Sequence, residues 1–503
     1  MLSTTVALLL LIFVLGVFSL VAFRASKPAE EMSVDDYFTA RGSLTTSKVG
    51  FTLFASSIGG WLLFGPPQVA YFGGFFDVMG YAIAVMVPLI LVAYIGPVIR
   101  RHAPMGITLG DYAGIAVGRR MQASIGGLCV LLMLALLISE LAAAGRALAF
   151  LTGLSSTSVI IMIASVTAMY TAYGGLRASL HTDVWQAIAI LILVTVIFAS
   201  MLGDLGQFLT DAATYTPVDR FNDWEHGSIA QFTMGSFLSG LALLISLTCL
   251  QLFNQGNWQR VYAAESDEAV TKGALLAASM VFPMMFIIGF LGTAIAGSKG
   301  PLEDASATFL VLAETFSPLL QACAVVLIIS LVCSTSDSLL NSVVVSCSRD
   351  FLGVMPTISQ ARKASLLVMG VVVLFALSDS PPQAFGSDFF LFLELMATAV
   401  AVPLFLTLID EIHPETAVTG AIGGIVCVFL YGFLVPLENA AGPLYRVFPD
   451  RIATGLHYIL KPVGTSGGPH LNIFITALVG SALLTYLASR MITQEDVGHD
   501  EAE

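Results

Sequence analysis

The chain has 503 residues, of which 57% are hydrophobic and only 11% are charged, and its mean hydropathy is +0.88. This composition excludes a soluble globular domain and indicates a membrane protein with many spans. The formal net charge of −13 does not point to nucleic acid, because the excess is acidic and lies partly in the last ten residues, which we expect to be disordered.

Apolar stretches of about 20 residues, the length that crosses a bilayer as a helix, recur along the whole chain. They predict an all-α polytopic membrane protein with about 13 transmembrane helices, which places the two termini on opposite sides of the membrane. The predicted spans are 4–23, 49–72, 75–99, 121–150, 155–173, 183–202, 231–253, 273–297, 318–345, 360–378, 386–408, 414–435 and 470–490.

Lys and Arg residues are concentrated in the loops on one side of these spans. If the N-terminus lies outside, the outer loops hold few of them, namely Arg220, Lys299, Arg446, Arg451 and Lys461. Basic loops are retained on the cytoplasmic side during insertion. The sequence therefore predicts a multi-pass plasma-membrane protein with its N-terminus outside and its C-terminus in the cytoplasm.

The ninth predicted span carries a polar patch. Ser334, Asp337, Ser338, Asn341 and Ser342 are spaced at i, i+3, i+4, i+7 and i+8, which is one face of a helix. In hydrocarbon such a stripe must face protein, water or an ion, so it is a candidate functional site. The alternative is that the hydroxyls only bond back to carbonyls one turn earlier, which explains scattered hydroxyls better than a run containing a carboxylate.

The second predicted span contains strong helix breakers. Gly59-Gly60 lies at mid-depth and Pro66-Pro67 follows a turn later, so we interpret this span as a discontinuous helix. Broken helices at membrane depth free carbonyls that can hold an ion. The alternative, small residues that let two helices touch, does not explain the prolines.

Two further polar stretches have ordinary explanations when each is taken alone. Residues 170–186 form an inner loop leading into a helix that starts at Thr182, so Thr182 or Asp183 can be an N-cap. Residues 257–264, on the inner side after the seventh span, are typical of an interfacial loop anchored by Trp258.

Taken together, four motifs resemble those of the sodium:solute symporter family, which includes the proline, pantothenate, urea and sodium/glucose cotransporters. The resemblance covers roughly residues 5 to 430. The motifs are Gly59-Gly60-Trp61, Tyr-Thr-x-x-Gly-Gly-Leu-Arg-Ala with Thr-Asp-x-x-Gln at 170–186, Asn-Trp-Gln-Arg-x-x-Ala-Ala at 257–264, and Ser-Thr-x-Asp-Ser-x-Leu-Asn-Ser at 334–342.

The resemblance implies a leucine-transporter-like core of two inverted five-helix repeats. In the sequence itself only Gly235 and Gly240 suggest a second broken helix, in the seventh span. The implied division is an N-terminal extra helix and inner loop (1–48), a first repeat (49–202), an outer loop (203–230), a second repeat (231–408), two C-terminal helices (409–490) and an acidic cytoplasmic tail (491–503).

A sodium ion is a hard cation that prefers oxygen ligands. The resemblance implies a sodium site made of the carbonyls of Ala55, Ile58 and Leu331 and the hydroxyls of Ser334 and Thr335. No other metal is expected.

Two further positions are interpreted through the same resemblance. Asp183 resembles the acidic residue on the inner route of sodium release. Ser57 and Gly59 depart from the proline transporters, which carry aspartate and serine there, and this weakens proline as the substrate.

Charges within the spans are the best clues to the solute, because each must be paired, solvated or neutral. Glu140 and Glu394 either form helix–helix hydrogen bonds or bind an amine or polar amide. Arg146 is close enough to the outer end of its span to snorkel. Trp61, Phe64, Gln68 and Ser57 are further substrate candidates by their position along the broken helix.

The predicted function is sodium-coupled import of a small polar organic solute by alternating access. Its partners are the solute, sodium and the lipid bilayer. We expect no enzymatic activity, no organic cofactor and no nucleic acid, and the sequence predicts no particular oligomeric state. Two alternatives stay open, a membrane sensor that uses a symporter-like module and a proton-coupled symporter.

Overall fold

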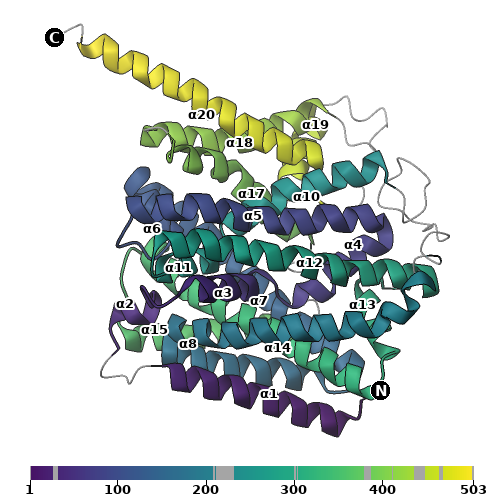
Figure 1. Cartoon of the computed structure of the whole chain (residues 1–503). Coiled ribbons are helices and arrows are strands. Elements are labelled where there is room, and N and C mark those ends of the chain that lie inside the picture. Colours follow the sequence, from purple (N-terminus) through teal and green to yellow (C-terminus); the bar gives the residue numbers. More distant parts are fainter. Residues whose placement is uncertain are drawn as a thin grey trace.

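The chain, described here as a computed structural model, is a bundle of long helices that run side by side (Figure 1). The structure describes residues 2–26, 32–207, 210, 232–299, 302, 304–378, 387–409, 412–435, 448–463 and 468–500. Within these residues the β features are two isolated bridges, Leu44 with Ala264 and Val463 with Pro469. The predicted all-α class is confirmed. Most of the predicted outer loop 203–230 and the end of the predicted tail lie outside the described residues.

The helices that matter for the site come from both halves of the chain. Their bounds are α1 Thr4–Ala25, α2 Val34–Phe38, α3 Thr46–Ser57, η1 Gly60–Leu63, α4 Gly65–Gly73, α5 Phe75–His102, α6 Leu109–Ala116, α7 Arg119–Thr152, α8 Ser156–Met201, α10 Met234–Leu252, α11 Gln255–Ala263, α12 Asp267–Lys299, α13 Thr308–Glu314, α14 Pro318–Val345, a π-helical turn Ser346–Phe351, α15 Ile358–Ala376, α17 Ser387–Leu406, α18 Pro414–Leu434, α19 Phe448–Leu460 and α20 Leu471–Asp500.

The number of spans depends on how α8 is counted. Within the described residues, 11 helices are long and apolar enough to cross a membrane, and the bent pair Thr46–Ser57 with Gly60–Tyr71 brings the number to 12. α8 is assigned as a single helix of 46 residues. A straight helix of that length would measure about 69 Å, more than twice the hydrocarbon thickness of ~30 Å.

The chain reverses inside α8 at Gly175, whose φ of 60° and ψ of −149° are not helical. Tyr170 Oη and Thr182 Oγ1 both donate to Asp337 Oδ2, at 2.9 and 3.2 Å. Twelve residues of straight helix would separate them by about 18 Å, which the two side chains cannot bridge. α8 is therefore two spans, which gives the 13 predicted.

The turn in α8 explains why glycine stands at position 175. Its φ is positive, and a Cβ there would lie 2.4 Å from the carbonyl oxygen of Tyr37. The prediction of a loop before Thr182 is wrong, because helix continues on both sides of this one-residue turn. Thr182 and Asp183 lie inside the second arm and are not N-caps.

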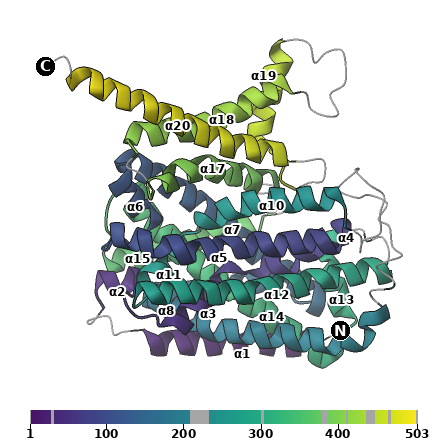
Figure 2. The ribbon, with the colours of Figure 1, turned by 45° about the horizontal axis from the view of Figure 1, so that its top comes forward.

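The two termini lie at opposite ends of the bundle, as an odd number of crossings requires (Figures 1 and 2). Figure 2 shows α18, α19 and α20 along one edge of the bundle. α20 continues to Asp500, so the disorder predicted for the last ten residues is wrong for those described. Extending a nucleated helix into a segment without proline requires little free energy.

The second broken helix is not where Gly235 and Gly240 suggested. α10 runs through both glycines, and a Cβ on Gly80 would meet the Gly240 Cα at 2.7 Å. Gly240 thus allows α5 and α10 to cross closely. The break falls later, between α10 and α11 at Phe253 and Asn254. The interfacial-loop interpretation of 257–264 is also wrong, since α11 is a buried helix and Trp258 is fully buried.

Candidate functional site

The first broken span consists of α3, η1 and α4, with a bend of 61°. Ile58 and Gly59 are extended, which ends the α3 hydrogen-bond ladder and leaves its last carbonyls without helical partners. The two prolines do not cause the break. They lie in the first turn of α4, where a missing N–H is tolerated.

Two hydroxyls of α14 face these free carbonyls. Ser334 Oγ lies 3.2 Å from the oxygen of Ala55 and 2.9 Å from that of Leu331. Thr335 Oγ1 lies 3.2 Å from the oxygen of Ile58 and 3.0 Å from that of Leu331. The structure thus brings together the five residues that the resemblance implied, and at most 5% of any of them is exposed.

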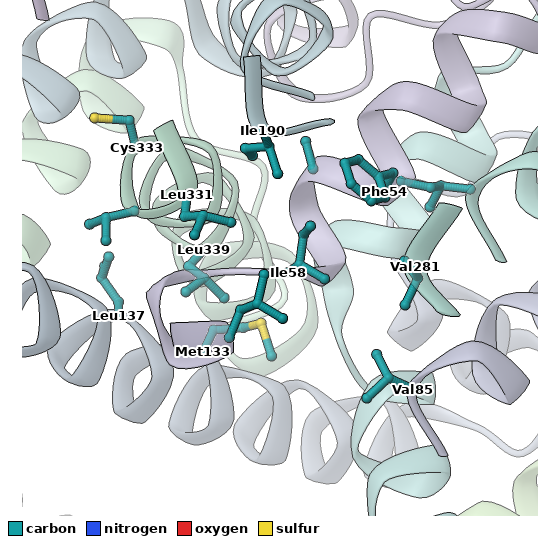
Figure 3. Packing of buried hydrophobic residues seen from close by; sticks show 14 of the residues in the cluster. Phe54, Ile58, Val85, Met133, Leu137, Ile190, Val281, Leu331, Cys333 and Leu339 are labelled. Carbon is teal, nitrogen blue, oxygen red and sulfur yellow. The ribbon is translucent and has the colours of Figure 1, made fainter. Parts of the chain in front are cut away.

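Apolar side chains surround this oxygen cluster. Figure 3 shows Phe54 and Ile58 of the broken span in the same packed cluster as Leu331 and Leu339 of α14. Such surroundings exclude water and strengthen any contact between an ion and these oxygens.

Glu140 of α7 contacts the backbone at the break between α3 and η1. The backbone N–H of Gly60 donates to Glu140 Oε2 at 2.6 Å, and a Cβ on Gly59 would lie 2.2 Å from Glu140 Oε1. The carboxylate therefore satisfies an N–H left free by the break, at the positive end of a helix. This geometry favours the helix–helix hydrogen bond over the substrate contact for Glu140.

We expect Glu140→Ala to lower the free energy of unfolding by ~1 to 3 kcal/mol, because the buried Gly60 N–H loses its acceptor. Glu140→Gln keeps an acceptor oxygen and serves as the matched variant, with a much smaller effect. Thermal unfolding of both proteins in detergent checks this. Equal melting temperatures for the alanine variant and the unchanged protein would contradict the assignment.

Beyond the hydroxyl pair, the polar stripe of α14 makes contacts with both arms of α8. Asp337 accepts hydrogen bonds from Tyr170 and Thr182 of α8, and Asn341 Nδ2 donates to Ser179 Oγ at 2.9 Å. The stripe therefore faces protein, which is one of the three surroundings expected for it. Some hydroxyls also bond back along α14, for example Ser338 to the Ser334 oxygen at 2.9 Å, so the alternative explanation holds for part of them.

A fully buried ion pair closes this network. Arg260 of α11 donates to Asp183 Oδ2 at 2.5 Å and to Ser338 Oγ at 2.6 Å. It also donates to the carbonyl oxygens of Thr52, at 3.0 Å, and Gly256, at 2.7 Å. One guanidinium thus ties α11 to α3, α8 and α14. Asp183, the residue predicted on the sodium release path, is therefore paired with this arginine.

The remaining substrate candidates all lie along the broken span and differ in how far they are buried. Trp61 is half-buried with its ring 6.1 Å from that of Tyr81, and the guanidinium of the exposed Arg146 lies 5.2 Å from the Phe64 ring centroid. Gln68 is half-buried on α4. Ser57 is buried, and its hydroxyl has no hydrogen-bond partner in the described part of the chain.

Glu394 of α17 is buried among groups from other helices. Ser246 of α10 is within hydrogen-bonding reach of its carboxylate, and Tyr81 of α5 is an electrostatic neighbour. Tyr81 lies between α5 and the broken span, with its ring 6.1 Å from that of Trp61. Tyr81 and Arg260 were not among the predicted site residues. Arg260 stands in the Asn-Trp-Gln-Arg motif at 257–264, but nothing close to it in the sequence indicates its buried partners.

Comparison with known proteins decides the family. The family model described as the sodium:solute symporter family matches residues 37–411. The chain belongs to this family. It is 26% identical over 407 residues to a spermidine transporter of Candida albicans, covering 79% of this chain and 75% of that protein. It is also 26% identical over 220 residues to a sodium/sialic acid symporter of Aliivibrio fischeri, covering 42% and 43%.

Solved structures establish the leucine-transporter-like fold. A sodium-coupled sialic acid symporter, substrate-bound and outward-open, superposes with a TM-score of 0.69 at 17% identity and covers 95% of this chain and 98% of that one. Mhp1, a nucleobase-cation-symport-1 family transporter, gives 0.59 at 14% identity, covering 91% and 94%. MhsT, in complex with L-phenylalanine, gives 0.52 at 13% identity, covering 88% and 97%.

Proposed function

We propose that this sodium:solute symporter imports a small organic amine and that sodium binds between α3 and α14. The observation that supports the site is the position of the Ser334 and Thr335 hydroxyls opposite the freed carbonyls of Ala55 and Ile58. Three carbonyls and two hydroxyls form a set of neutral oxygens, which suits a hard monovalent cation. The hydroxyls that donate to these carbonyls would rotate to present their lone pairs to the ion.

Sodium at this place would couple the two halves of the core. The ion takes oxygens from the broken span and from α14, so its binding stabilises the arrangement in which the two helices are in contact. A membrane potential of 100 mV gives ~2.3 kcal/mol per charge, and a tenfold sodium gradient adds about 1.4 kcal/mol. One sodium ion per cycle thus supports accumulation of roughly a few hundredfold.

The proposed import rests on the proposed orientation and on an inward sodium gradient. With the N-terminus outside, basic residues such as Arg100, Arg101, Arg119 and Arg120 lie in the cytoplasm. The Arg260–Asp183 pair then lies on the inner side of the sodium position, where it blocks the release path that we assign to Asp183. Import requires this pair to separate after sodium and solute have bound.

The amine class is supported by Glu394. It is a buried carboxylate, only 6% exposed, and within the described residues it takes part in no ion pair. A buried acid without a basic partner is expensive unless a ligand cation or a proton neutralises it. The match to a transporter of spermidine, a cationic polyamine, points the same way.

The test is uptake into proteoliposomes under an inward sodium gradient, with labelled spermidine, a monoamine, proline and sialic acid. We expect amines to accumulate with sodium outside and not with potassium. Accumulation that follows a proton gradient instead would favour the proton-coupled alternative, and binding without accumulation would favour the sensor alternative.

Glu394→Gln is expected to raise the amine concentration for half-maximal uptake roughly tenfold or more, because a charge-assisted contact becomes neutral. The sodium concentration for half-maximal uptake should stay within about twofold, since Glu394 lies on α17 and the proposed sodium ligands lie on α3 and α14. Concentration series for both ligands measure the two values, with Glu140→Gln as the matched acid-to-amide control. An unchanged amine affinity in Glu394→Gln would remove this residue from the substrate site.

A further inference from the structure

A cavity of about 930 Å³ lies between α7 and α18, away from the central site. Its walls come from the start of α7, the first half of α18 and Val400 of α17. Most of the lining is apolar, including Met121, Ile422 and Ile425. Ile422 in its wall is 60% exposed, a value expected for a side chain that faces lipid tails.

One end of this cavity is basic. Arg119 and Arg120 line it, and the only acid among the lining residues is Glu415, so the charged residues of the lining carry a net charge of +1. Arg119 donates to the backbone carbonyls of Asp350 and Phe351 and keeps its full charge. Arg120 is exposed, and no hydrogen bond or ion pair of its guanidinium occurs within the described part of the chain.

Backbone groups add to the positive potential at that end. α7 begins at Arg119 and has no side-chain cap at Gly118, so its first N–H groups are free for a ligand. α18 also begins at this cavity, at Pro414. A soluble anion alone would leave the apolar wall unused, and an apolar molecule alone would leave the arginines unused.

We propose that the α7–α18 cavity binds an anionic phospholipid with a hydroxylated headgroup, of the phosphatidylglycerol type. The phosphodiester contacts Arg120 and Arg119, a headgroup hydroxyl donates to Glu415, and the acyl chains lie along Val418, Ile422 and Ile425. Basic pockets between helices on the cytoplasmic side are suited to such headgroups. The lipid joins α18 to the core helices α7 and α17, and Arg119 links it to the π-helical turn that follows α14.

Native mass spectrometry of the purified full chain with added phosphatidylglycerol tests this proposal. We expect a retained phosphatidylglycerol adduct, reduced roughly tenfold in Arg120→Gln through loss of a charge-assisted contact. Ile422→Trp, which fills the apolar part, should reduce it as well. Lys363→Gln removes an exposed cation on α15, outside the cavity, and should leave the adduct unchanged.

Three results would overturn the proposal. Phosphatidylcholine retained as well as phosphatidylglycerol would show that the headgroup charge is not recognised. Competition by soluble glycerol phosphate at equal concentration would assign the site to a free phosphate ester. Equal adducts in Arg120→Gln, Ile422→Trp and the unchanged protein would place the lipid elsewhere.

Discussion

Ser334→Ala and Thr335→Ala are each expected to raise the sodium concentration for half-maximal transport by roughly tenfold or more. Each change removes one oxygen from the cluster around Ala55, Ile58 and Leu331 without adding bulk. Losing a contact between an ion and a dipole should have an effect similar to losing a hydrogen bond to a charged group, ~1.5 to 3 kcal/mol. Sodium-dependence curves of uptake at a fixed solute concentration provide the measurement.

Two matched controls accompany these variants. One keeps the hydroxyl at position 335, and the other removes a neighbouring hydroxyl that is not a proposed ligand. Thr335→Ser keeps the hydroxyl and should change the half-saturating sodium concentration only mildly. Ser336→Ala removes a buried hydroxyl that has no hydrogen-bond partner in the described part of the chain and is not one of the proposed ligands, so it should be mild as well. If both alanine variants at 334 and 335 behave like Thr335→Ser, the ion binds elsewhere.

The largest loss of stability is expected from Arg260→Ala. It leaves the Asp183 carboxylate fully buried without its cation and removes donors from Ser338 and the Thr52 carbonyl. Removing one partner of a buried ion pair typically costs ~3 to 5 kcal/mol. Because the same arginine closes the proposed release path, we also expect the remaining folded protein to favour the inward-open state. Thermal unfolding in detergent and cysteine accessibility from the inner side measure the two effects.

A double-mutant cycle separates the ion pair from general damage. Asp183→Asn and Arg260→Met should each be destabilising, and the variant that combines them should lose clearly less than the sum of these two single changes. Arg100→Ala is a control, since its pairing with Asp267, at 3.9 Å, is partly exposed and should contribute ~1 kcal/mol or less. Additive losses in the cycle would mean that Arg260 and Asp183 do not act as a pair.

The sequence predicted the features that depend on local patterns. Apolar stretches predicted the number of spans, and the glycine pair at 59–60 predicted the first break. The spacing of the polar residues on α14 predicted a stripe that must face protein, water or an ion. Such signals are readable because helix geometry and the absence of water in the bilayer act on neighbouring residues.

What the sequence did not predict depends on partners far away in the chain. Arg260 belongs to a buried network only because α11 folds back against α3 and α14, and nothing near residue 260 reports this. The role of Gly240 depends on Gly80 of another helix, which is why it was mistaken for a break. Glu140 could not be separated from Glu394 by sequence, since both are single acids in apolar spans and only their contacts differ.

Direct binding of radioactive sodium to the purified protein, without any transported solute, is the closest test of the proposed sodium site. The account predicts saturable binding that potassium does not displace, and binding roughly tenfold weaker in Thr335→Ala than in Thr335→Ser. Sodium binding of equal affinity in these two variants would contradict it.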